Sequence, residues 1–88
     1  MSERFFLYDE KDTTVTRFVS FAGEHSRYDL ALMQTDRYYG KSVVLNLQGN
    51  TYAIIGRDDL EEPGYIEYAF NMGEEEAAEL KEFLYEVI

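Results

Sequence analysis

Residues 42–55, SVVLNLQGNTYAII, form two short apolar segments separated by a turn signal, and they decide the fold of the chain. The two segments, Ser42 to Gln48 and Thr51 to Ile55, are rich in the β-branched and large apolar residues that suit a pleated sheet. Gly49 and Asn50 between them tolerate positive φ, as a tight type I′ or II′ turn requires. The stretch therefore predicts an antiparallel β-hairpin.

A two-residue turn also fixes the register of this hairpin, with Gln48 opposite Thr51. In this register one face of the hairpin is strongly apolar and the other is mixed. We expect helices to cover the apolar face, and the mixed face to be partly open or met by another subunit. The apolar face would consist of Leu45, Leu47, Tyr52 and Ile54, and the mixed face of Val44, Asn46, Ala53 and Ile55.

Two further strands are predicted upstream of this hairpin. Thr13 to Ala22 is dense in β-branched and aromatic residues, and Arg27 to Gln34 alternates large apolar side chains with smaller or polar ones. The turn-forming residues Gly23 to Ser26 join them as a second hairpin. Phe5 to Tyr8 is expected to add a short edge strand.

Downstream of Ile55 the pattern changes to a helical period. Asp58 to Glu62 predicts a helical turn with an aspartate as its cap, and Tyr65 to Met72 predicts a short helix, with an aromatic strand as the alternative. Glu74 to Ile88 is the clearest helix, because its apolar residues form one stripe and its first turn is acidic. This apolar stripe must pack on the sheet.

The order of these elements predicts an α+β fold in a single domain spanning residues 1–88. The strands occupy roughly residues 4–55 and the helices roughly residues 58–88. Because no helix lies between the early strands, the sheet is expected to be antiparallel, with four or five strands. One or two C-terminal helices would then pack on one face.

The composition limits the function. The net charge is −10, and residues 45–88 hold two basic against eleven acidic residues. This charge opposes nucleic-acid binding and is typical either of a solvated helical layer or of a surface for a basic partner. The chain contains no cysteine, which removes disulfides, thiolate metal sites and cysteine nucleophiles. Without a signal-peptide pattern or a long apolar stretch, we expect a cytoplasmic protein that does not enter the membrane.

No pattern of catalytic, metal-binding or cofactor-binding residues stands out. His25 is the only histidine and has no patterned nucleophile or orienting partner. The acidic run Asp58 to Glu62 lacks the ligand spacing of a calcium loop, and the glycines form no phosphate-binding motif. No catalytic residue, metal or cofactor is therefore predicted.

The most distinctive local feature is the loop Thr35 to Lys41, TDRYYGK. It places aromatic and cationic side chains between two strands, where recognition residues concentrate. The candidate binding residues are Arg37, Tyr38, Tyr39 and Lys41. In the alternative structural interpretation, a tyrosine packs on the sheet edge and Arg37 pairs with Asp36 or Asp29.

Several segments together resemble a family of short acidic proteins of unknown function from Bacillus and Staphylococcus relatives among the Gram-positive bacteria. The resemblance implies a small cytosolic bacterial protein and brings no activity, cofactor or catalytic residue with it. It is carried by residues 2–9, SERFFLYD; 16–21, TRFVSF; 36–41, DRYYGK; 44–48, VLNLQ; 53–65, AIIGRDDLEEPGY; and the ending EFLYEVI.

Three functional hypotheses remain open. The leading one is a non-enzymatic interaction module that binds another protein or a second copy of itself, through the mixed sheet face or the loop Asp36 to Lys41. The second is a small enzyme or ligand-binding domain whose pocket forms at a subunit interface; His25 near tyrosine or carboxylate groups in a closed cleft would favour it. The third, nucleic-acid binding, requires that four basic residues, Arg17, Arg27, Arg37 and Lys41, share one surface.

Overall fold

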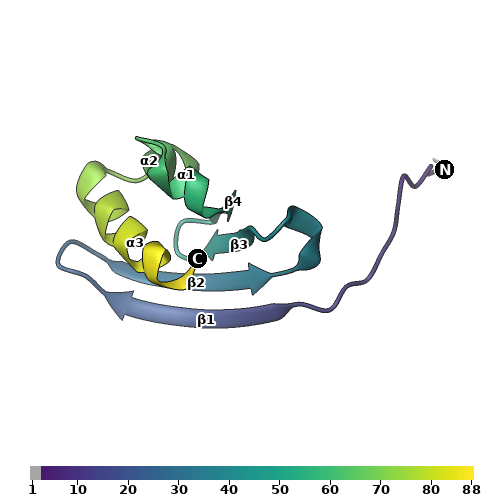
Figure 1. Cartoon of the computed structure of the whole chain (residues 1–88), viewed down its shortest axis with the longest axis horizontal. Helices are drawn as coiled ribbons and strands as arrows, with labels where there is room; N and C mark the ends of the chain where they lie inside the picture. The colour runs from purple at the N-terminus through teal and green to yellow at the C-terminus, as the bar shows by residue number, and fades with distance from the viewer. Residues whose placement is uncertain (1–2) are drawn as a thin grey trace.

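The computed structural model describes residues 3–88 and has the α+β arrangement that the sequence predicts (Figure 1). Within these residues four strands are followed by three helices, and a single 3-10 turn connects the second and third strands. The strands are β1 Val15–Ala22, β2 Arg27–Gln34, β3 Ser42–Asn46 and β4 Thr51–Ile55; the helices are α1 Arg57–Glu61, α2 Tyr65–Phe70 and α3 Glu74–Val87; the turn is η1 Asp36–Tyr38.

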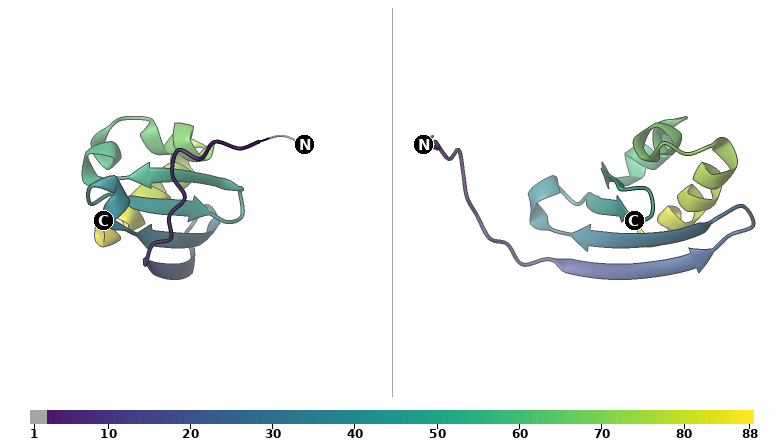
Figure 2. Two further views of the ribbon diagram at one scale, coloured as in Figure 1. Left: turned by 90° about the vertical axis from the view of Figure 1, so that its right-hand side faces the viewer. Right: turned by 180° about the vertical axis from the view of Figure 1, so that it is seen from behind.

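The sheet is antiparallel throughout, and the strand order β1-β2-β3-β4 repeats the order in the chain. Short connections suffice for this topology, and the predicted turn between β1 and β2 is closed by a hydrogen bond of 2.8 Å from Gly23 N to Ser26 O. All three helices lie on the same side of the sheet (Figures 1 and 2). The molecule therefore has two layers and one sheet face without helices.

The core lies between the sheet and the helices. Helix α3 contributes the apolar stripe predicted from its period, and its Leu80 and Leu84 are fully buried. The buried cluster consists of Tyr28, Leu30, Leu32, Val44, Ala53, Ile55, Leu60, Ile66, Phe70, Ala77, Leu80 and Leu84.

The helix ends follow local backbone chemistry. The N-cap of α1 is Gly56, and not an aspartate as predicted, because the Asp59 side chain instead reaches back and accepts a hydrogen bond of 2.8 Å from Gly56 N. Gly64 and Asn71 adopt left-handed conformations, with φ of 78° and 53°, at the two ends of α2. This confirms the helix over the alternative strand between residues 65 and 70.

The predicted edge strand at Phe5 to Tyr8 is wrong. Residues 3–14 contain no strand and form an extended arm that projects beyond the start of β1 (Figure 1). The reason is a set of contacts to the connection between β2 and β3: Glu10 pairs with Arg37, and Asp12 accepts a hydrogen bond from Thr35. These contacts hold the arm away from the sheet edge.

The predicted register of the second hairpin is also wrong, by two residues. Leu45 lies opposite Tyr52, and not opposite Ile54, so that residues 47–50 form a longer loop. The cause is a long-range contact, since Leu47 N donates to the backbone oxygen of Asp29 at 2.9 Å and the Gln48 side chain donates to the Asp29 carboxylate at 2.6 Å. A shift of two residues leaves the division of side chains between the two faces unchanged.

The helices cover the mixed face and leave the apolar face open, which is the reverse of the expectation. Val44 and Ile55 are fully buried under the helices, whereas Ile54 points to the other side. The register between β2 and β3 decides this, because it places Leu32 opposite Val44 and Leu30 opposite Asn46. The largest apolar side chains of β2 therefore join the face of Val44, and the core forms there.

This arrangement makes opposite predictions for two neighbouring isoleucines of β4. Ile55→Ala removes a fully buried side chain and should lower the free energy of unfolding by about 2–5 kcal/mol. Ile54→Ala, on the open face, should cost roughly 1 kcal/mol. Urea denaturation at low protein concentration measures both, and the loss of strand propensity is the same in each variant. A larger effect at Ile54 would mean that the face assignment is wrong.

Candidate interaction surface

The sheet face without helices carries two rows of side chains that run across all four strands. One row joins Phe18, Ala31, Leu45 and Tyr52, and the second joins Thr16, Met33, Val43 and Ile54. Strand pairing fixes both rows, because directly opposed residues point to the same side of a sheet. We call this surface the open face.

The large residues at the two edges of the open face are the most exposed. Phe18 on β1 is 77% exposed and Tyr52 on β4 is 68% exposed, although both are large and apolar. Between them the small side chain of Ala31 is buried, and Leu45 is half-buried. The largest exposed apolar patch of a protein is often a functional surface, which makes this face a candidate contact site.

The open face is electrically neutral. Residues 42–55 contain no charged side chain. At the end of the face near the first hairpin, Asp29 accepts hydrogen bonds from Ser20 at 2.6 Å and Arg27 at 3.2 Å. The Ser20 bond, aided by Arg27 and Gln48, holds the pKa of Asp29 below its ordinary value in spite of partial burial. The aspartate thus remains ionised and paired.

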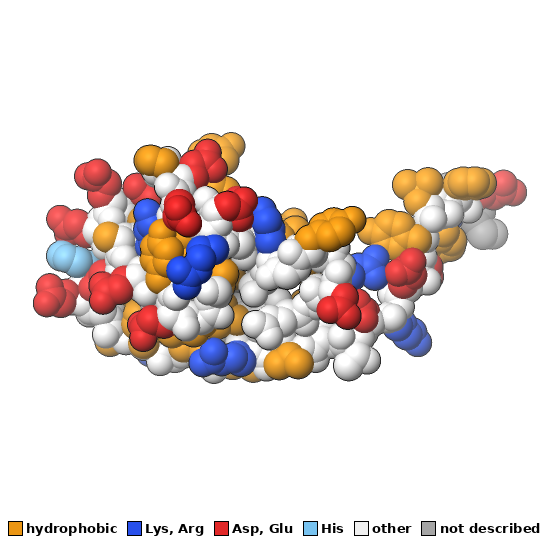
Figure 3. All heavy atoms as spheres, in the orientation of Figure 1, with side chains coloured by type: hydrophobic (Ala, Val, Ile, Leu, Met, Phe, Trp, Pro, Cys, Tyr) orange, Lys and Arg blue, Asp and Glu red, His pale blue; other side chains and the backbone are white. Residues whose placement is uncertain are grey.

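The acidic charge lies instead in the helical layer. Residues 56–88 hold two basic and eleven acidic residues, a net charge of −9. Figure 3 shows carboxylates gathered around the helical end of the molecule, beside the histidine. The sheet thus separates an acidic layer from a largely apolar face with no net charge.

The N-terminal arm is a second exposed apolar surface. Its four large side chains from Phe5 to Tyr8 are between 63% and 91% exposed, and Figure 3 shows hydrophobic groups along it. The base of the arm is anchored by Arg37, whose guanidinium lies 2.9 Å from Glu10 and 5.4 Å from the centre of the Tyr8 ring. The apolar residues beyond this anchor project away from the body of the protein.

The candidate loop residues do not form one cluster. Arg37 turns toward the arm and pairs with Glu10, and not with Asp36 or Asp29; the Glu10 hydrogen bond raises the pKa of Arg37. Tyr38 is half-buried, while Tyr39 is wholly exposed in a left-handed conformation with φ of 54°.

Lys41, the fourth candidate, turns toward helix α1. Its ammonium lies 3.0 Å from the Asp59 carboxylate and 3.6 Å from Asp58. Burial alone would raise the pKa of Asp59, but the hydrogen bond from Gly56 N and the Lys41 charge outweigh it and keep this pKa low. Two of the four candidate residues, Arg37 and Lys41, are therefore engaged by their own chain.

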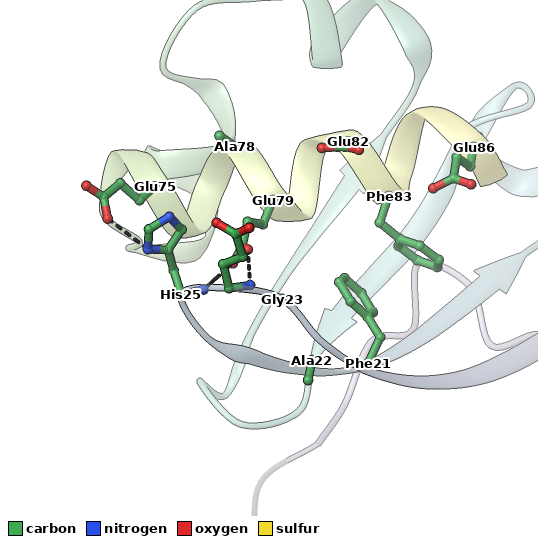
Figure 4. A pocket seen from close by; sticks show the side chains of 11 residues that line it. Phe21, Ala22, Gly23, His25, Glu75, Ala78, Glu79, Glu82, Phe83 and Glu86 are labelled. Atoms are coloured by element: carbon green, nitrogen blue, oxygen red, sulfur yellow. Dashed lines mark hydrogen bonds and ion pairs between the residues drawn. The ribbon is translucent and has the colours of Figure 1, made fainter.

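A broad hollow of about 940 Å³ lies where helix α3 passes over the first hairpin (Figure 4). Its floor is formed by the rings of Phe21 and Phe83, with centroids 4.8 Å apart, and glutamates of α3 stand at its rim. His25 Nδ1 lies 3.0 Å from Glu75 at this rim. The hollow is open to solvent, so His25 is near a carboxylate but is not in a closed cleft.

Glu79 joins helix α3 to the first hairpin, a role that the helical period of the sequence does not predict. Its carboxylate accepts hydrogen bonds from the backbone N–H groups of Glu24 and His25 and, at 2.7 Å, from the Tyr28 hydroxyl. These bonds, that of Tyr28 above all, keep the pKa of Glu79 low against the effect of burial. The carboxylate lies so close to Gly23 that a Cβ at this position would displace it.

Residues 3–88 contain neither a candidate metal-binding group nor a candidate membrane-spanning helix. No three or more histidine, cysteine, aspartate or glutamate side chains are grouped so that they could hold a metal ion. In the same residues no helix has the length and apolar character needed to cross a membrane.

Comparison with known protein families matches residues 7–86 to the SAV0927-like family. The chain belongs to the SAV0927-like family. The match spans all four strands, η1 and all but the last residue of α3, and it agrees with the resemblance to uncharacterised bacterial proteins seen in the sequence. The family name states no activity, ligand or partner, and no curated protein matches the chain.

The low pKa of Glu79 predicts how the stability of this SAV0927-like protein changes with pH. A carboxyl whose pKa is lower in the folded state stabilises the fold above its unfolded pKa, and this contribution is lost as the pH falls through the folded pKa. Glu79→Gln should therefore lower the urea midpoint at about pH 7 and have little effect at about pH 2. Glu82→Gln, an exposed acid on the same helix, serves as the control. An equal effect of Glu79→Gln at both pH values would contradict the assigned role.

Proposed function

We propose that this SAV0927-like protein is a non-enzymatic interaction module that contacts its partner through the open face. The observation that carries the proposal is the pair of rows across the four strands, which bring large apolar side chains to a surface that the helices leave uncovered. Burying such side chains at an interface contributes about 1.5–3 kcal/mol each. Thr16, Ser20 and the Arg27–Asp29 pair supply the polar and charged rim that surrounds the apolar core of an interface.

The neutral charge of the open face supports a partner whose contact surface is apolar and uncharged. Fully buried interface centres are depleted in charged residues and enriched in aromatic ones. Leu45 lies between the aromatic edges Phe18 and Tyr52 and would occupy such a centre. The acidic helices lie on the other side of the sheet, where they favour solubility.

The loop Asp36 to Lys41 stays in the proposal as an accessory contact. Arg37 and Lys41 are engaged within the chain, so Tyr39 is the side chain that this loop offers to a partner. An exposed aromatic residue on a short, anchored turn loses little conformational entropy on binding.

The hollow beside α3 supports the alternative function, ligand binding at a subunit interface. Its apolar floor and the His25–Glu75 pair provide both apolar and polar contacts. Because the hollow is open in the single chain, a second subunit would have to close it.

Site-specific photo-crosslinking in cells tests the proposal with two exposed tyrosines of the same chain. A photoreactive phenylalanine replaces Tyr52 on the open face or, as the matched control, Tyr68 on α2, which is 89% exposed. Position 52 should give adducts of defined mass and position 68 should give none. The same probe at Tyr39 tests the loop.

The probes at positions 52 and 68 can also contradict the proposal. No adduct at position 52, or the same adducts at position 68, would show that the open face is not a specific contact surface. Adducts at position 39 alone would move the site to the loop.

A further inference from the structure

We infer that the partner on the open face is a second copy of this chain, whose N-terminal arm lies across it. The inference rests on the proposed function and names the occupant of the surface. Each copy carries both parts of the contact: an arm with four exposed large apolar side chains, and a neutral apolar sheet face. In a two-fold dimer each arm would cover the open face of the other chain.

The base of the arm directs it away from its own sheet. Arg37 is held by Glu10 and lies over the Tyr8 ring, and Thr35 Oγ1 donates to Asp12 at 3.0 Å. The remainder of the arm projects from the body of the protein (Figures 1 and 2). With the arm included, the chain extends 50 Å along its longest axis and 29 and 24 Å along the other two. A contact with another molecule would bury the side chains of Phe5 and Phe6 and leave the contacts at the base of the arm intact.

The areas fit the pairing of arm and face. Four strands about 4.8 Å apart and roughly 17 Å long give a face on the order of 300–400 Å². A stable interface needs about 800 Å² on each partner, so the sheet face alone is too small. The arm has three aromatic residues, and each can bury about 150–250 Å². The face and the arm together reach the area that a stable dimer needs.

The charges permit this pairing in spite of the net charge of −10 on each chain. Residues 3–8 hold one glutamate and one arginine and are neutral, as is the open face. The helical layer with its net −9 lies on the far side of the sheet, so the acidic layers of the two copies would be separated by both sheets. Charges separated by more than about 10 Å of salt solution are largely screened.

Sedimentation of the full-length chain over a range of concentrations tests the dimer. The variant Phe5→Ser/Phe6→Ser/Leu7→Ser changes exposed side chains of the arm and should leave the fold intact. Wild type should dimerise, this variant should dissociate at least about tenfold more readily, and Tyr68→Ser should match wild type. A wild-type chain that stays monomeric, or an arm variant that dimerises equally well, overturns the inference.

Engineered disulfides test where the arm lies, because the chain has no cysteine of its own. Mixing a Phe6→Cys chain with a Tyr52→Cys chain should give a disulfide-linked heterodimer under mild oxidation. Phe6→Cys mixed with Tyr68→Cys should give none. In the double variant Phe6→Cys/Tyr52→Cys, a disulfide within one chain would overturn the inference, since the arm would then cover its own sheet.

The outcomes separate this inference from the proposed function. A monomeric chain whose position 52 cross-links to a protein of different mass excludes the second copy and leaves the interaction module standing. The absence of any adduct at position 52 defeats the proposed function itself, whatever the state of the arm.

Discussion

Both faces of the four-stranded sheet carry apolar side chains, but the helices of the chain cover only one of them. The side chains of Val44 and Ile55 pack under the helices, while Leu45, Tyr52 and Ile54 alternate with them and point outward. Successive side chains of a strand point to opposite faces of the sheet. A strand with apolar residues at consecutive positions therefore presents apolar side chains on both faces. The exposed apolar surface is therefore a consequence of the same strands that build the core.

Two acidic residues of the helical layer hold the elements of the fold together. Glu79 connects the first hairpin to α3, and Asp59 accepts hydrogen bonds from Gly56 N at the start of α1 and from Lys41, which immediately precedes β3. Each of these carboxylates accepts hydrogen bonds from at least one backbone N–H group and from a side chain, and these bonds keep its pKa low. With the helices fixed on one side in this way, the other side of the sheet remains available for binding.

The sequence predicts the order of the elements and the division of side chains between faces, because both depend on local periodicity. It does not predict the register of the second hairpin or the face that the helices cover, since these depend on Asp29 holding residues 47 and 48 and on Leu32 lying opposite Val44. The candidate loop was located by its composition, yet the partners of Arg37 and Lys41 are distant in sequence, at Glu10 and Asp59. For the same reason the role of Glu79 could not be found by periodicity.

The most direct test compares the accessibility of the Ile54 and Ile55 methyl groups to a soluble paramagnetic probe by NMR, at low and at high protein concentration. The account predicts that Ile55 is protected at every concentration, and that Ile54 is accessible in the dilute monomer and becomes protected as the chain associates. An accessible Ile55, or an Ile54 that stays accessible in the associated state, would contradict it.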